Sequence, residues 1–248
     1  MLKIENLTKK FGSVTALKNI SFELKSGVYG LLGPNGAGKS TLMNIITLGL
    51  NPDTGDIMWN NESIYKLGSA YREILGFMPQ QQGLYDGFTG FEFLNYIAVL
   101  KGINKKSIKS EIRRVSELTN MTEHLKKRIS GYSGGMKQRL LLASSVIGNP
   151  KLIILDEPTA GLDPKERIRT RELIKSIAED RIVIVATHIV SDIEMIADEI
   201  ILMKNGQLIE KNKYEELCEK YGNNEGLEGV YMHFFSDEDY YDVNKIWT

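Results

Sequence analysis

Residues Gly33–Leu42 read GPNGAGKSTL, and this stretch decides how the rest of the chain is interpreted. The pattern Gly33-x-x-x-x-Gly38-Lys39-Ser40 matches the phosphate-binding loop. Glycines let consecutive backbone N–H groups turn toward an anion, the lysine supplies a charge for the β- and γ-phosphates, and the hydroxyl supplies a ligand for Mg²⁺. An apolar run precedes the loop and a helical pattern follows it, as this motif requires.

Composition excludes several classes of protein. The chain has 31 Lys and Arg against 32 Asp and Glu, and this balance gives no support to a nucleic-acid partner. We find no apolar run near the ~18 residues of a membrane span and no signal-peptide core at the N-terminus. The single cysteine, Cys218, is expected to be a bystander on a helix. We therefore expect a cytoplasmic protein that reaches a membrane only through a partner.

Hydrophobic periodicity predicts an α/β fold. Alternating residues near 2–4, 20–24 and 57–59 indicate an antiparallel N-terminal β-subdomain. Continuous apolar runs at 27–32, 152–155 and 182–186 indicate buried strands of a mainly parallel sheet. Helical spacing dominates from about 84 to 148. We expect one domain over 1–235, with a core of 1–83 and 149–210, a helical insert at about 84–148, and a C-terminal helix and acidic tail within 211–248.

The helical insert carries clustered cations, including Lys101, Lys105, Lys106, Lys109, Arg113, Arg114, Lys126, Lys127 and Arg128. They form either an ordinary solvated helix face or a surface turned toward anionic lipid headgroups. Further along the chain, Ser191 and Glu194 have the spacing of a helix capping box.

Polar residues end two of the buried runs. Asp156 and Glu157 follow LIIL, and adjacent strand residues point to opposite sides, so one carboxylate can hold Mg²⁺ while the other faces water. His188 ends IVIVATH and is expected at the same sheet edge, in contact with the γ-phosphate or the attacking water.

The stretch YSGGMKQR, from Tyr132 to Arg139, resembles the signature of ATP-binding cassette (ABC) ATPases. GPNGAGKST, ILDEP, AGLDP and His188 follow the order of that family. The resemblance covers residues 1 to roughly 235 and implies a P-loop NTPase core that binds and hydrolyses ATP with Mg²⁺. It also implies two cassettes that sandwich two nucleotides and drive a separate transmembrane permease.

The resemblance assigns roles to matching positions. Glu157 is the general base, His188 and Lys39 stabilise the γ-phosphate, and Gln80 contacts water and Mg²⁺, although Gln81 or Gln82 could be the matching glutamine. Ser40, Gln80 and Asp156 are the implied Mg²⁺ ligands. The implied nucleotide-binding residues are Phe11 (alternatively a core aromatic), Gly33, Pro34, Asn35, Gly36, Ala37, Gly38, Lys39, Ser40 and Thr41, with Ser133, Gly134, Gly135 and Asp163 acting on the partner's ATP.

Two positions depart from the family pattern. Met136 stands where glutamine is usual and cannot make the hydrogen bonds of an amide, and Phe11 replaces the more usual tyrosine. The YSGGM form most resembles single-cassette exporter subunits for drugs, lipids or peptides. The alternatives are an importer motor and a soluble ABC ATPase that acts on a ribosome or another complex. The second cassette is either identical or different. The aromatic residues of segment 83–94 form either the expected permease contact or part of the core.

Overall fold

The structure is a computed structural model that describes residues 1–80 and 83–239. These residues form two compact units. Of the described residues, unit 1 comprises 1–24, 28–61 and 186–239, and unit 2 comprises 25–27, 62–80 and 83–185. Gln81 and Gln82, the two alternative glutamines, lie outside the described residues.

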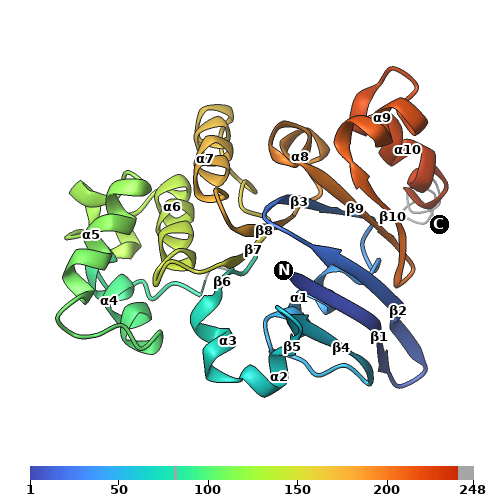
Figure 1. The fold of residues 1–248 in the computed structure, drawn as a ribbon. Coiled ribbons are helices and arrows are strands. Elements are labelled where there is room, and N and C mark those ends of the chain that lie inside the picture. Colours follow the sequence, from blue (N-terminus) through green and yellow to red (C-terminus); the bar gives the residue numbers. More distant parts are fainter. Residues whose placement is uncertain (81–82, 240–248) are drawn as a thin grey trace. The chain divides into compact units, whose positions relative to one another are not determined.

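An antiparallel sheet opens unit 1, as the alternating pattern predicts (Figure 1). Its strand order is β2 (Val14–Leu24), β1 (Leu2–Phe11), β4 (Thr54–Trp59). Leu2 and Ile4 are buried on one face. Asn6 then adopts a positive φ of 48° where the strand register shifts, so Leu7 returns to the buried face.

The second sheet segment of unit 1 contains β3 (Gly27–Leu32), which pairs in parallel with β9 (Glu199–Lys204), and β10 (Gln207–Lys213), which pairs with β9 in antiparallel fashion. Its helices are α1 (Lys39–Ile46), α8 (Val190–Ile196), α9 (Tyr214–Tyr221) and α10 (Gly226–Asp239). Helix α8 packs tightly on β3: a Cβ at Gly30 would lie 2.2 Å from the side chain of Ile193. Only glycine allows this approach.

Unit 2 contains the parallel pair β6 (Leu75–Met78) and β7 (Leu152–Asp156), together with β8 (Ile182–Ala186) and the short β5 (Glu62–Ser63). The predicted apolar runs at 152–155 and 182–186 are fully buried. Its helices are α2 (Ile64–Leu67), α3 (Ser69–Ile74), α4 (Gly90–Leu100), α5 (Ile108–Leu118), α6 (Gly134–Ser145) and α7 (Pro164–Ile177). Short 3₁₀ turns span Thr122–His124 and Ile129–Gly131.

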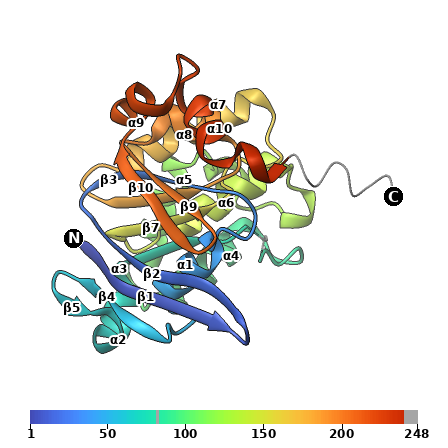
Figure 2. The same ribbon diagram turned by 90° about the vertical axis from the view of Figure 1, so that its right-hand side faces the viewer.

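Helices α4, α5 and α6 pack against one another, as helical spacing in this segment predicts (Figures 1 and 2). Thr89 and Glu92 form a capping box that starts α4. The carboxylate of Glu111 on α5 accepts hydrogen bonds from Arg114 at 2.7 and 3.0 Å and from the backbone N–H of Gly148 at 2.7 Å. This carboxylate therefore ties α5 to the chain that leaves α6.

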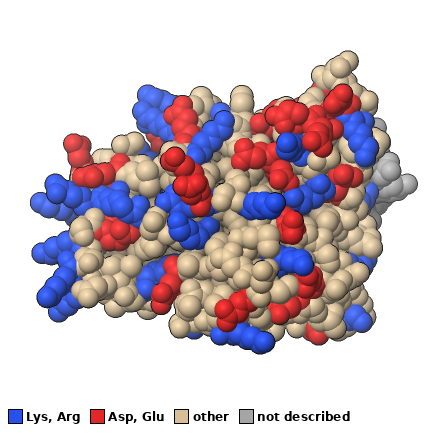
Figure 3. Space-filling view, viewed as in Figure 1, with Lys and Arg blue, Asp and Glu red and all other residues tan. Residues whose placement is uncertain are grey.

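Cationic side chains gather over the α5 region, whereas both signs mix elsewhere on the face shown in Figure 3. Two of the nine clustered cations form ion pairs on their own helix, Arg113 with Glu117 and Arg114 with Glu111. Lys101 is different, because its ammonium donates hydrogen bonds to the carbonyls of Arg72 and Leu75. Burial lowers the pKa of that lysine.

The expected capping box at Ser191 is wrong. The N-cap of helix α8 is Ile189, two residues before Ser191, and the helix has no side-chain cap. Glu194 instead accepts a hydrogen bond from the hydroxyl of Tyr214 at 2.7 Å, so its carboxylate makes a tertiary contact with α9.

The C-terminal segment is more ordered than the expected helix and tail. The predicted helix is α9, which carries Cys218, and a second helix, α10, continues as far as Asp239. The end of the acidic tail, from 240 onward, lies outside the described residues. Among the helices that are described, none is long and apolar enough to cross a membrane.

Candidate functional site

The phosphate-loop stretch has the backbone that its glycines predict. Gly33, Gly36 and Gly38 have φ values of +155°, +80° and +102°. A Cβ at Gly33 would lie 2.1 Å from the carbonyl oxygen of Met203, and a Cβ at Gly38 would lie 2.7 Å from that of Ala16. Gly33 and Gly38 therefore exclude a side chain through both conformation and space, and Gly36 through conformation alone.

Lys39 begins α1 and turns back across this loop. Its ammonium donates hydrogen bonds to the carbonyl oxygens of Gly33 at 2.5 Å and Pro34 at 3.0 Å. Gly38 precedes the helix as its N-cap and provides no side-chain cap. A cation, a helix N-terminus and a glycine-rich backbone thus meet in one place, which is the chemistry of a polyphosphate site.

The surrounding parts of unit 1 fix the loop. The N–H of Gly206, in the turn between β9 and β10, donates to the carbonyl of Ala37 at 3.0 Å. The carbonyl of Gly206 accepts from the N–H of Lys18 on β2 at 2.7 Å. Phe11 lies at the end of β1, and its side chain is 50% exposed. The alternative that Phe11 is a core aromatic is therefore wrong.

In unit 2, Asp156 is the last residue of β7 and Glu157 follows with a φ of +53°. A non-glycine residue rarely adopts this left-handed conformation, and such strain is typical of functional sites. The side-chain amide of Gln138, on α6, donates to the carbonyl oxygens of Glu157 at 3.1 Å and Pro158 at 2.7 Å. Gln138 is only 5% exposed and stabilises this turn.

Sequence reasoning did not single out Gln138. It lies within YSGGMKQR, but no spacing rule relates it to a turn 19 residues later in the chain. The signal available was its position one helical turn after Gly134, on the side of α6 that also buries Leu141 and Leu142.

The signature stretch forms the start of α6. The hydroxyl of Ser133 accepts a hydrogen bond from the N–H of Met136 at 3.3 Å and caps the helix. Ser133 and Gly134 are exposed, which leaves the helix N-terminus accessible. Asp163 caps α7 in the same way, by accepting from the N–H of Glu166 at 3.0 Å.

The remaining predicted residues divide between the two units. Unit 1 carries Phe11, the loop Gly33–Thr41 and His188, which is exposed just after β8. Unit 2 carries Gln80, exposed after β6, together with the signature, Asp156, Glu157 and Asp163. Over the described residues, no three His, Cys, Asp or Glu side chains gather as a metal site. The hydroxyl of Ser40 and the carboxylate of Asp156 are nevertheless suitable ligands for Mg²⁺, which usually keeps waters and phosphate oxygens as its other ligands.

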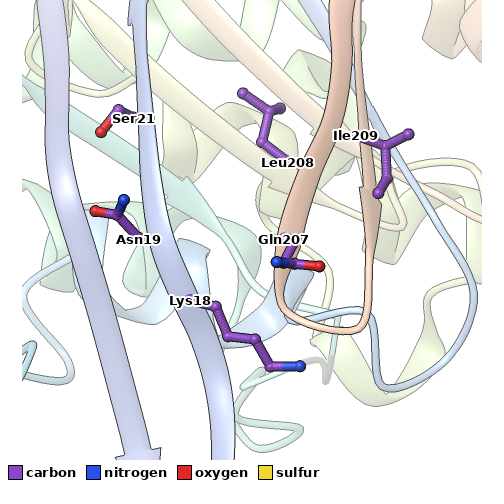
Figure 4. Close-up of a pocket in the computed structure, with 6 residues that line it drawn as sticks. All are labelled: Lys18, Asn19, Ser21, Gln207, Leu208 and Ile209. Carbon is purple, nitrogen blue, oxygen red and sulfur yellow. The ribbon is translucent and has the colours of Figure 1, made fainter.

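A separate groove of about 450 Å³ lies between β2 and β10 in unit 1 (Figure 4). Its lining residues are Lys18, Asn19, Ser21, Gln207, Leu208 and Ile209. None of them belongs to the loop at 33–41, so this groove is distinct from the phosphate-binding residues.

The profile of the ABC transporter family matches residues 17–160 of this chain. The chain belongs to that family. The lantibiotic transport ATP-binding protein SrtF of Streptococcus pyogenes is 36% identical, over 92% of the chain and 98% of that protein. The linearmycin resistance ATP-binding protein LnrL of Bacillus subtilis is also 36% identical, over 90% of the chain and 72% of that protein.

Solved structures agree with this assignment. A dimeric ATP-binding cassette in a post-hydrolysis state with ADP and Pi is 27% identical, with a TM-score of 0.75 over 86% of the chain and 98% of that structure. An ABC transporter ATP-binding subunit superposes with a TM-score of 0.83 over 94% of the chain and 98% of that structure; at 24% identity it supports the P-loop fold alone. The chain is an ABC transporter ATP-binding subunit and an ATPase.

Proposed function

We propose that this chain is the motor subunit of an ABC exporter, which dimerises on ATP and drives a separate transmembrane permease. The observation that carries its nucleotide chemistry is the ammonium of Lys39, held across a glycine-rich loop at the start of α1. Export is supported by the relatives, whose names refer to lantibiotic transport and linearmycin resistance.

In unit 1, the backbone N–H groups of the loop 33–41, apart from Pro34, which has none, bind the phosphates of ATP, and Lys39 neutralises the β- and γ-phosphates. His188 stabilises charge on the γ-phosphate. The exposed ring of Phe11 stacks on adenine. Its proximity to the loop supports this role, because Phe11 pairs with Val14 on β2 and Ala16 on the same strand lies against Gly38.

In unit 2, Glu157 is the general base toward water. Its left-handed backbone and the hydrogen bond from Gln138 to its carbonyl fix the main chain from which the carboxylate side chain extends. Ser40 of unit 1, and Asp156 and Gln80 of unit 2, would supply oxygen ligands for Mg²⁺, and this ion would neutralise phosphate charge when bound. Removing a general base typically costs about 10²–10⁴ in rate.

A second ATPase subunit, identical or different, completes the site. Ser133, Gly134 and Gly135 bring an accessible helix N-terminus to the γ-phosphate held by that subunit, and Asp163 lies in the loop that communicates between the two nucleotides. The relative solved as a dimer supports this arrangement. Met136 contributes its N–H to the cap of α6, a contact that does not require glutamine.

The permease contact is an aromatic surface on unit 2. Tyr85, Phe88 and Tyr96 form one cluster, with ring centroids 5.1 to 6.4 Å apart. A groove of about 520 Å³ runs beside them, lined by Gly87, Phe88, Glu92, Asn95, Tyr96 and Val99. Only part of the expected segment 83–94 is core, since Phe93 is buried whereas Tyr85 and Phe91 are exposed.

A permease bound at this surface would hold the chain on the inner face of the cell membrane as a peripheral subunit. The importer motor and the soluble ATPase are the alternative functions. Both would use the same nucleotide chemistry and would differ in what the aromatic surface binds.

Affinity capture from native cells tests the proposal. The Glu157→Gln chain is captured with ATP, with Lys39→Ala as a matched control that should not close on nucleotide. A polytopic membrane protein that co-purifies only with Glu157→Gln supports the transporter motor, and transport assays with that permease then separate export from import. Ribosomes or a soluble complex, without a membrane protein, would overturn the transport function.

A further inference from the structure

A lysine covers one face of the Phe11 ring. The ammonium of Lys9 lies 5.6 Å from the ring centroid, within the range of a cation–π interaction. The Lys9 side chain is 13% exposed, whereas Phe11 is 50% exposed. The aromatic ring therefore presents one face to a cation and keeps a large accessible surface elsewhere.

Asp53, in the turn before β4, holds this lysine in place. One carboxylate oxygen accepts a hydrogen bond from the Lys9 ammonium at 3.0 Å, and the other accepts the N–H of Lys10 at 2.6 Å. The N–H of Asp53 donates to the carbonyl of Thr8 at 2.9 Å. Three bonds thus fix the end of β1 next to Phe11.

The Asp53 carboxyl group is charged at physiological pH. Hydrogen bonds from Lys9 and from the backbone of Lys10 lower the pKa of Asp53 below its ordinary value. The carboxylate stays ionised at neutral pH and the lysine keeps its anionic partner.

We propose that Lys9, held by Asp53, is a positioning residue for nucleotide binding that orients the Phe11 ring and leaves one face of it for adenine. This inference rests on the proposed stacking of Phe11 on the base. An exposed phenylalanine otherwise samples several rotamers, and fixing it in advance reduces the entropy lost on binding.

A base-specific readout tests this role. Isothermal titration calorimetry of the full chain with Mg²⁺ compares ATP with inorganic tripolyphosphate, which has no base to stack. We expect Lys9→Met to weaken ATP binding by about two- to fivefold, the range of an exposed cation–π contact, and to leave tripolyphosphate binding unchanged. Lys9→Arg should restore ATP binding, because a guanidinium also stacks on aromatic rings.

Lys10→Met is the matched control, since Lys10 contacts Asp53 through its backbone and the substitution removes the same charge one residue away. It should change neither affinity. If Lys9→Met weakens both ligands equally, the lysine acts on the phosphates and the inference is overturned. If Lys9→Met leaves ATP binding unchanged, the inference is overturned as well.

Phe11→Ala distinguishes the positioning role of Lys9 from the adenine-stacking role of Phe11. If Phe11→Ala weakens ATP but Lys9→Met does not, the inference alone fails and the stacking role of Phe11 stands. If Phe11→Ala leaves ATP affinity unchanged, the adenine-binding role fails, and the role of Lys9 fails with it. Tripolyphosphate binding by every variant verifies that the phosphate loop is still folded.

Discussion

The side chain of Gln138 bonds to the main chain of Glu157. Its buried amide lies 3.1 Å from the Glu157 carbonyl and 2.7 Å from that of Pro158. Ser133 caps the helix that carries Gln138, so α6 links the exposed signature at its start to the strained turn that carries Glu157. A displacement of α6 would therefore act directly on this turn.

Replacing Gln138 should slow catalysis more than it weakens nucleotide binding. Gln138→Leu leaves two carbonyls without this donor and releases the left-handed conformation of Glu157, so we expect a loss of about tenfold in kcat at an unchanged ATP dissociation constant. ATPase kinetics and calorimetry measure the two quantities. Ser144→Ala, on the same helix, is the control, and equal turnover by both variants would show that the bonds from Gln138 are dispensable.

Lys39→Met should abolish ATP binding. The substitution keeps most of the side-chain stem and removes the ammonium that lies over Gly33 and Pro34, so the loop loses its full positive charge. A fall in ATP affinity of about 100-fold or more is expected by calorimetry, since a charged contact of this kind is worth about 3 kcal/mol. An affinity within twofold of the unmodified chain would contradict the assignment of the loop.

The Glu111 carboxylate should make the stability of unit 2 depend on pH. Its hydrogen bonds to Arg114, and then to the N–H of Gly148, lower its pKa in the folded state. The resulting stabilisation is present above the unfolded pKa of about 4.3 and is lost as pH falls through the lower folded value.

At neutral pH, Glu111→Gln should therefore cost about 1 kcal/mol in the free energy of unfolding, a value discounted for solvent screening at this partly exposed pair. The difference from the unmodified chain should shrink below about pH 4, the region in which Glu111 itself becomes protonated. Urea denaturation at several pH values measures it. Glu117→Gln, which removes an exposed ion pair on the same helix, should cost far less.

The aromatic surface of unit 2 should be needed for the permease and not for nucleotide binding. Tyr96→Ser removes an exposed ring that contacts Tyr85 and Phe88 and lines the groove. We expect unchanged ATP affinity and loss of the co-purifying membrane protein. Met195→Ser, which removes another exposed large side chain, on α8, is the control. Retention of the permease by Tyr96→Ser would place the docking surface elsewhere.

Local patterns predicted much of this fold. The loop at 33–41, the buried strands and the helical segment carry their information in neighbouring residues, because glycine geometry and hydrophobic period act locally. The Ser191–Glu194 spacing predicted a capping box that does not form, because Glu194 accepts a hydrogen bond from Tyr214 on another helix. The contacts of Gln138 with Glu157 and of Lys9 with Asp53 join segments that only tertiary packing brings together, and no sequence period encodes them.

The turn between β9 and β10 limits where foreign sequence can be introduced. Asn205 and Gly206 form a hairpin tip, normally a tolerant site for an inserted tag or fluorophore. Here Gly206 is buried and bonded to Ala37 and Lys18, so an insertion would pull on the phosphate loop. The exposed residues Asn223–Asn224, between α9 and α10, have no such tie to that loop and offer the safer position for a reporter.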